Sequence, residues 1–85
     1  MTIQQIRYAL KIAETGSVCR AARMLGVRQP SVSSAVAQLE REMHIVIFER
    51  NSKGMRLTDA GQEFLDDASV LERTFGHLES RYCAR

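Results

Sequence analysis

Short polar side chains follow one face of a segment whose apolar residues have helical spacing. Val32, Val36 and Leu39 recur at intervals of four and three residues, and Met43 continues the series, as on the buried face of an α-helix. Pro30 suits the first turn of such a helix, where a backbone N–H has no intrahelical partner. The other face carries hydrogen-bonding side chains: Gln29, Ser33, Ser34 and Gln38. This face is either plain solvent surface or a surface that hydrogen-bonds to a ligand.

The side chains at the start of this predicted helix have the chemistry to read base pairs. A glutamine amide can pair with N6 and N7 of adenine, and a serine hydroxyl can bond to a base edge or a phosphate. The alternatives are that Gln29 caps a backbone group and that Ser33 lies on plain surface. Arg28 cannot cap the helix, but its guanidinium can reach a phosphate or a guanine edge. Pro30 shapes the helix start and offers apolar contact.

Positive charge is concentrated in the first two thirds of the chain. The net charge is +2, but residues 1–56 contain nine basic and four acidic residues, and residues 57–85 contain three basic and six acidic residues. A basic part joined to an acidic helix is typical of a polyanion-binding head on a non-binding stalk, with a solvated mixed-charge surface as the alternative. Candidates for phosphate contact are Arg20, Arg23 and Arg50.

The composition excludes several other classes of protein. Cys19 and Cys83 lack CxxC spacing, which indicates reduced thiols, and His44 and His77 lack the neighbouring ligands of a zinc site. No paired carboxylates, activated nucleophile or phosphate-binding glycine loop occurs, so we expect neither an enzyme nor a cofactor. The longest apolar run, residues 45–48, is far shorter than the roughly 20 residues of a membrane span. We expect a single cytoplasmic domain.

The preceding segments predict the scaffold that holds this helix. Thr2 and Gln5 form a capping-box pattern at the start of a first helix. Ser17 can cap a second helix, two turns long, that ends at Gly26. Two short helices joined by a glycine-containing turn are typical of a helix-turn-helix, here about residues 18–37.

A β-hairpin wing is predicted for residues 45–57. Residues 45–48 are rich in β-branched side chains, residues 51–54 have turn chemistry, and residues 55–57 suit a short return strand. Basic side chains near the tip of such a wing can reach a phosphate backbone, and three occur there: Arg50, Lys53 and Arg56.

A long amphipathic helix is predicted from residue 59 onward. Thr58 can cap it, and Asp59 favours the positive end of the helix dipole. One small head has too little surface to cover its apolar stripe, so we predict pairing with the same helix of a second chain, with packing onto the chain's own head as the alternative. The stripe follows an a/d-like spacing over about three heptads: Ala60, Phe64, Ala68, Leu71, Phe75, Leu78 and Tyr82.

Seven short segments, each weak alone, are specific when taken together. They are Gln5-Ile6-Arg7-Tyr8, Ala13-Glu14-Thr15-Gly16-Ser17, Ala21-Ala22 with Leu25, Gln29-Pro30-Ser31-Val32-Ser33, Gln38-Leu39-Glu40, Phe48-Glu49-Arg50, and Leu57-Thr58 with Ala60-Gly61. In this order and spacing, nearly the whole chain resembles the N-terminal domain of LysR-type transcriptional regulators. The resemblance implies a mainly α fold: a winged helix-turn-helix head in residues 1–58, with three helices and a two-stranded β wing, and a linker helix in residues 59–85 that dimerises antiparallel.

The resemblance also implies the partners. It implies a bacterial regulator that binds a partly palindromic promoter operator in double-stranded DNA as a homodimer through the linker helix, with a tetramer as an option for the full-length protein and no membrane partner. In the family, an effector-sensing domain that binds a small molecule follows the linker helix. These 85 residues stop before it, and we expect an excised DNA-binding domain, with an unusually short natural protein as the alternative.

The resemblance places the DNA contacts as well. Major-groove readout falls on Gln29, Pro30 and Ser33, to which we add Arg28 and Ser34, and the minor-groove contact of the wing falls on Lys53. The further candidates for backbone or minor-groove contact are Ser17, Arg20, Arg23, Ser31, Gln38, Arg50, Ser52 and Arg56. The candidates for the dimer interface are Phe64, Ala68, Leu71, Phe75, Leu78 and Tyr82.

Three positions depart from the family pattern. Arg28 stands where a small capping residue is usual, and Ser34 stands where an arginine is common. Positive charge therefore moves to the other side of the helix's first turn, which changes the bases that are read. His44 stands where the family has the glycine that closes the helix. Histidine tolerates a positive φ less well than glycine, so we expect local strain or a shifted helix end.

Two classes of function are open at this point. The first is sequence-specific regulation of transcription by a dimer whose half-sites lie about one or two helical turns apart. The second is a dimerisation or protein-interaction module with only non-specific DNA affinity, which Ser34 favours because it lacks the usual long donor.

Overall fold

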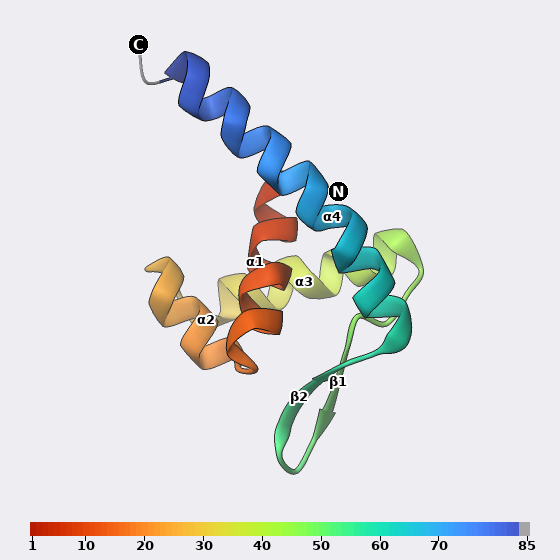
Figure 1. The fold of residues 1–85 in the computed structure, drawn as a ribbon. Helices are drawn as coiled ribbons and strands as arrows, with labels where there is room; N and C mark the ends of the chain where they lie inside the picture. Colours follow the sequence, from red (N-terminus) through yellow and green to blue (C-terminus); the bar gives the residue numbers. More distant parts are fainter. Residues whose placement is uncertain (84–85) are drawn as a thin grey trace.

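Three short helices, a two-stranded wing and a long C-terminal helix follow one another along the chain in the computed structural model, which describes residues 1–83. This order confirms the predicted fold class, mainly α with a winged helix-turn-helix. Residues 84–85, the end of the predicted linker segment, lie outside the described residues. The elements are α1 (Ile3–Thr15), α2 (Val18–Leu25), α3 (Gln29–Met43), β1 (Phe48–Asn51), β2 (Gly54–Leu57) and α4 (Asp59–Leu78), which continues into a π-helical turn, η1 (Glu79–Cys83) (Figure 1).

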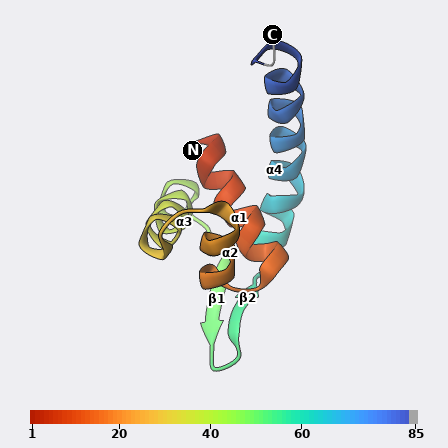
Figure 2. The same ribbon diagram turned by 90° about the vertical axis from the view of Figure 1, so that its left-hand side faces the viewer.

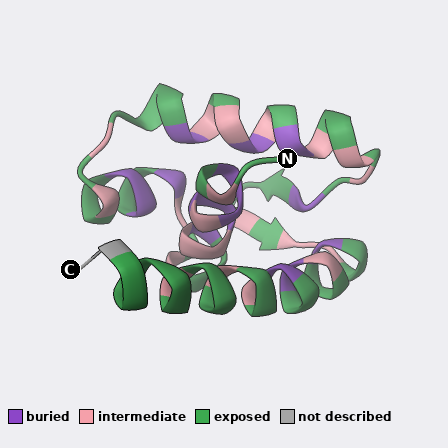
Figure 3. Ribbon diagram, turned by 90° about the horizontal axis from the view of Figure 1, so that it is seen from above, coloured by how far each residue is buried: buried purple, intermediate pink, exposed green. Residues whose placement is uncertain are grey.

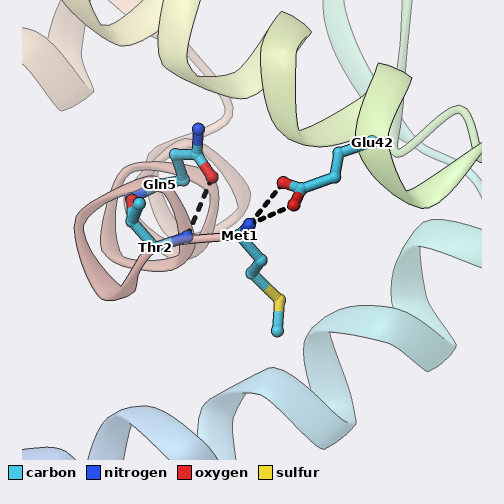
Figure 4. Close-up of polar contacts among 4 residues, drawn as sticks. All are labelled: Met1, Thr2, Gln5 and Glu42. Carbon is cyan, nitrogen blue, oxygen red and sulfur yellow. Dashed lines mark hydrogen bonds and ion pairs between the residues drawn. The ribbon is translucent and has the colours of Figure 1, made fainter.

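Side-chain caps begin the helices where the sequence predicted them. The Gln5 backbone N–H donates to Thr2 Oγ1 at 3.1 Å, and the Thr2 N–H donates back to Gln5 Oε1 at 3.0 Å, which confirms the capping box (Figure 4). Ser17 caps α2 by accepting the Arg20 backbone N–H, and Thr58 caps α4 by accepting the Gly61 backbone N–H, each through one side-chain hydrogen bond. The ammonium of Met1 donates to both carboxylate oxygens of Glu42, which joins the start of α1 to the end of α3 (Figure 4).

His44 closes α3 in the left-handed region, with φ of 58° and ψ of 39°. Its backbone N–H donates to the Glu40 carbonyl oxygen. Among the described non-glycine residues, His44 alone has a positive φ. Helix α3 thus ends at Met43, as the family pattern implies. Of the two expected outcomes, a strained backbone at His44 or a shifted helix end, the structure shows the strained backbone.

The core lies where α1 packs against α2, α3 and α4 (Figures 1 and 2). Three large apolar residues in it, Val32, Leu39 and Ile47, have no exposed surface. Burial of each such side chain contributes about 1.5–3 kcal/mol. The other buried apolar residues are Ile6, Tyr8, Ala9, Ile12, Val18, Ala21, Ala22, Val36, Phe48, Leu65 and Ala68.

The first strand of the wing begins at Phe48 rather than at Ile45, so the prediction of a strand over residues 45–48 is wrong. Hydrogen bonds to other elements explain the difference. Glu40 Oε2 accepts from the backbone N–H groups of Ile47 and Phe48 at 2.7 and 3.2 Å, and the Thr58 N–H donates to the Ile47 carbonyl oxygen. The backbone of the β-branched segment is therefore bonded to α3 and to the start of α4. It has no partner strand before Phe48, which pairs with Leu57.

Helix α4 packs its first half onto the head and leaves its second half exposed (Figure 3). Gly61, Leu65 and Ala68 are buried against the head. The core therefore continues about ten residues past the predicted boundary after residue 58, because the first turns of α4 close its open side. The C-terminal half of α4 rises beyond the head in two perpendicular views (Figures 1 and 2).

Candidate nucleic-acid interface

The first turns of α3 present a polar surface to solvent. Arg28, Gln29, Pro30, Ser31 and Ser34 are all exposed. Residue 28 is the N-cap but makes no side-chain capping hydrogen bond, so the prediction that an arginine cannot cap here is confirmed. The positive end of the α3 dipole lies at the same place, where an anion is favoured.

The glutamine side-chain amides of α3 differ from those of Gln4 and Gln62 in their hydrogen bonding. Gln4 Nε2 donates to the Tyr8 hydroxyl at 2.8 Å, and Gln62 Nε2 donates to Asp66 Oδ1 at 2.8 Å. The side-chain amides of Gln29 and Gln38 are exposed and form no hydrogen bond with any described residue.

An amide without an internal hydrogen bond can bond to a ligand, and no hydrogen bond within the protein has to break. The alternative that Gln29 caps a backbone group does not occur in this structure, because the start of α3 carries no side-chain capping bond. The side-chain hydroxyls of Ser33 and Ser34 have no hydrogen-bond partner among the described residues either.

A cleft brings the start of α3 together with the start of α2 and the wing. Ser17, Gln29 and Arg50, three predicted site residues from three different elements, line it. Ser33 lies half-buried in an adjoining cleft that shares Arg50. The wing is thus held beside α3, and a ligand bound along α3 would meet the Arg50 guanidinium.

The two faces of the wing differ in the residues they carry. Phe48 pairs with Leu57 and Arg50 pairs with Met55, so these four residues share the face on which Phe48 is buried. Arg56 pairs with Glu49 on the other face. The predicted cluster of three cations at the wing tip is therefore divided, with Arg56 opposite a carboxylate and away from Arg50.

The tip of the wing carries Ser52 and Lys53, both exposed. The Lys53 backbone N–H donates to Asn51 Oδ1 at 2.9 Å, which fixes the turn, and Gly54 follows with φ of 123°. The Lys53 side chain therefore stands on a short, closed turn, and its minor-groove contact stays a prediction.

Helix α2 exposes two further predicted residues, Arg20 and Arg23. Arg23 Nη2 lies 3.9 Å from Cys19 Sγ. Ser17 Oγ accepts the Arg20 backbone N–H at 3.1 Å, so this hydroxyl caps α2 and retains its own proton for a phosphate. These roles stay predictions.

The predicted dimer residues fall into two groups. Leu71, Phe75, Leu78 and Tyr82 are exposed in the single chain, at 51%, 38%, 52% and 52%. Phe64 is half-buried against the core and Ala68 is 3% exposed. Ala68 therefore has almost no surface left for a second chain, and we remove it from the candidate interface.

Some residues that shape this surface carry no local signal. Met55 lines both clefts beside α3, and Glu40 ties α3 to the start of the wing. A glutamate within a helix normally faces solvent, and the tertiary hydrogen bonds from the backbone N–H groups of Ile47 and Phe48 give Glu40 this role. The Gln38-Leu39-Glu40 segment of the family resemblance is the one signal that marked it.

The part of the chain that the structure describes holds no group of three or more His, Cys, Asp or Glu residues able to bind a metal. Within the same residues, no helix combines the length and the apolar character needed to cross a membrane.

The geometry defines a winged helix-turn-helix domain, in which α2 and α3 form the helix-turn-helix and β1 and β2 form the wing. A family model described as bacterial regulatory helix-turn-helix protein, lysR family, matches residues 3–62. The chain belongs to this family, which consists of transcription regulators rather than enzymes.

Curated relatives support the same assignment. The chain is 41% identical over 71 residues to the HTH-type transcriptional regulator ClcR of Pseudomonas putida, which covers 84% of this chain and 24% of ClcR. It is 38% identical over 81 residues to TcbR of Pseudomonas sp. (strain P51), which covers 95% of this chain and 28% of TcbR. The chain spans about a quarter of the length of these relatives.

Solved structures of the family superpose on the chain. The DNA-binding domain of CbnR in its complex with DNA matches with a TM-score of 0.87 at 36% identity and full coverage of both chains, 100% of each. The DNA-binding domain of BenM with catB site 1 DNA matches with a TM-score of 0.89 at 30% identity, over 95% of this chain and 91% of that one.

Proposed function

We propose that this chain binds double-stranded DNA sequence-specifically and as a homodimer, with α3 in the major groove and the wing along the minor groove, and so regulates transcription in the bacterial cytoplasm. The observation that carries the proposal is the exposed polar surface of α3, where the side-chain amides of Gln29 and Gln38 form no hydrogen bond within the described residues and Arg50 lines a cleft with Gln29. The CbnR and BenM domains that the chain resembles were solved in complexes with DNA, which supports DNA binding by this chain.

The dimer part of the proposal rests on α4. Leu71, Leu78 and Tyr82 repeat at seven and four residues, and each is about half exposed in the single chain. Exposed large apolar residues at heptad spacing are typical of a helix that pairs with a second helix. A second copy of the same chain would place two α3 helices on one duplex, which suits a partly palindromic operator.

Selection of bound duplexes from a random pool, run at two salt concentrations, tests the proposal as a whole. We expect one enriched motif with two related halves, and an affinity that falls with salt because bound cations release counterions from the DNA. Binding without enrichment would instead favour a module with only non-specific DNA affinity.

Replacing Gln29 with alanine is expected to cost about 1–3 kcal/mol on the selected duplex and to relax the preference at one base pair, because the amide reads a base edge. Binding titrations against the four variants of each position measure both effects. Gln62→Ala, at an exposed glutamine of α4, is the matched control and should change neither. An unchanged sequence preference in the Gln29 variant would contradict the readout role.

Replacing Lys53 with alanine is expected to weaken binding to every sequence by a similar factor. It should also lower the slope of log affinity against log salt concentration by about one, because one phosphate contact is lost. Titrations at four salt concentrations on the selected and a scrambled duplex measure this slope. Lys11→Ala removes the same charge from α1, where Lys11 pairs with Glu14, and should leave the slope unchanged.

A further inference from the structure

Two carboxylates and an aromatic ring near the end of α4 converge on a single arginine of α1. Arg7 Nη2 donates to Glu79 Oε1 at 2.7 Å, and Arg7 Nε donates to Glu72 Oε1 at 3.2 Å. The Arg7 guanidinium carbon lies 5.1 Å from the centroid of the Phe75 ring, within the range of a cation–π contact. Because residues 72, 75 and 79 follow at three and four, they share one face, and Arg7 contacts this face over two turns.

This contact lies where apolar packing between the head and α4 has ended. Ala68 is the last α4 residue that is buried, and the ten residues from it to Leu78 span about 15 Å. A swing of about 10° at Ala68 would move the Leu78 end by about 3 Å. Among the described residues, both ion pairs between the head and the stalk, which we define as residues 69–83, are made by Arg7.

The space between the head and the stalk is otherwise an open cleft. Apolar packing does not fill it, so the polar cluster is what spans it. Its lining residues are Arg7, Leu10, Lys11, Glu14, Leu25 and Glu72. The hydrogen bond to Glu79, helped by the charges of Glu79 and Glu72, raises the pKa of the Arg7 guanidinium above its ordinary value.

The face of α4 held by Arg7 adjoins the face predicted to pair with a second chain. At about 100° per residue, Leu71, Leu78 and Tyr82 point within about 40° of one another. Glu72 and Glu79 point roughly 60–120° to one side of them, and Phe75 lies between the two faces. The turns of α4 that would contact a second chain are therefore the turns that Arg7 ties to the head.

We propose that Arg7 is a positioning residue that fixes the direction of the stalk relative to α3, and through it the separation of the two α3 helices of a dimer on DNA. The inference rests on the α4 dimer proposed above. One base pair inserted between half-sites moves one of them by about 3.4 Å and rotates it by about 34°. We call the contacts of Arg7 with Glu72, Phe75 and Glu79 the Arg7 clamp. A stalk held by this clamp would resist the displacement, whereas a stalk without the clamp would follow it.

The direction of the stalk can be measured within one chain. Spin labels on Cys19, which is exposed on α2, and on position 80 after Ser80→Cys report the head-to-stalk distance by pulsed dipolar EPR. A Cys83→Ser background and dilution with unlabelled chain keep the signal within single chains. We expect one narrow distance distribution with Arg7 present, and a shift or spread of about 3 Å or more after Arg7→Ala.

The consequence for DNA is measured with the selected duplex and with versions that carry two extra or two fewer base pairs between the half-sites. With Arg7 present, we expect the altered spacing to weaken binding by about tenfold or more, and after Arg7→Ala by less than about threefold. Affinity for a duplex with one half-site should stay the same, and so should the unfolding midpoint, because exposed ion pairs contribute little to stability.

Two further variants separate the clamp from a general charge effect. Glu72→Gln combined with Glu79→Gln removes the partners of Arg7 and should reproduce Arg7→Ala, with no added effect when all three are combined. Arg73→Ala removes an exposed arginine of α4 and should keep both the narrow distribution and the spacing preference.

An unchanged distribution or an undiminished spacing preference in Arg7→Ala would overturn the proposal. A parent chain that sediments as a monomer would contradict the α4 dimer itself, and the EPR distances would still decide whether Arg7 holds the stalk.

Discussion

Replacing Leu71 and Leu78 with aspartate is expected to give a folded monomer that binds the selected duplex on the order of 100-fold more weakly than the parent chain. Both side chains are about half exposed in the single chain, at 51% and 52%, so the fold of the head does not depend on them. In a paired α4 seam each would be buried, and an unpaired buried carboxylate costs several kcal/mol. Without a second chain, the gain from two linked heads on one duplex is lost.

Sedimentation at several protein concentrations measures the loss of the dimer, and binding titrations measure the loss of affinity. The matched control is His77→Asp combined with Ser80→Asp, which adds the same two carboxylates at exposed positions about 100–180° around the helix from Leu71 and Leu78. This control should remain a dimer. If the Leu71 and Leu78 variant also remained a dimer, the seam would have to lie on another face of α4.

The choice of these two residues depends on how α4 divides its apolar positions, which the sequence did not decide. The series Phe64, Ala68, Leu71 and Phe75 has the spacing of one continuous seam. A second series, displaced by one residue and made of Gly61 and Leu65, also passes through Ala68. The head packs against the second series, because Gly61 lets α4 approach Ile47. Packing onto the head therefore occurs up to Ala68, and from Leu71 onward the large apolar side chains are exposed in the single chain, so pairing with a second chain stays a prediction for that part of α4.

The local structure of the head was largely predictable. The capping box of Thr2 and Gln5 and the Ser17 cap depend on residues within three positions of each other, so the sequence contains all of their chemistry. Residues 45–47 were assigned to a strand on β-branched composition alone. Their actual conformation depends on Glu40 and Thr58, and such tertiary bonds override strand propensity.

The candidate interface was predictable as a set of residues but not as an arrangement. Residue type nominated Gln29 and Arg50, but only the fold brings them to one cleft. The strand register, which residue types do not specify, places Arg56 on the face of the wing opposite to that of Arg50. The Arg7 clamp joins residues more than 60 positions apart, and no local pattern could have indicated it.

Two substitutions of glycine by alanine in α4 are expected to have opposite effects on stability. A Cβ on Gly61 would lie 2.4 Å from the Ile47 carbonyl oxygen and 2.8 Å from the Ile47 Cα, and both are backbone atoms that cannot rotate away. A Cβ on Gly76 meets nothing within 4 Å. Alanine is favoured over glycine inside a helix by about 1 kcal/mol, so Gly76→Ala should stabilise the chain by up to that amount.

In Gly61→Ala the same gain is outweighed, because α4 must move away from Ile47 and loosen the packing of Leu65 and Ala68. Overpacking of this kind costs about 1–3 kcal/mol. Thermal unfolding at one fixed protein concentration measures the change, and each kcal/mol shifts the midpoint by roughly 4–8 °C in a domain of this size. A midpoint of Gly61→Ala at or above that of the parent chain would mean that α4 does not approach the Ile47 backbone as closely as described. The buried first half of α4, and with it the direction of the stalk, would then need to be reassigned.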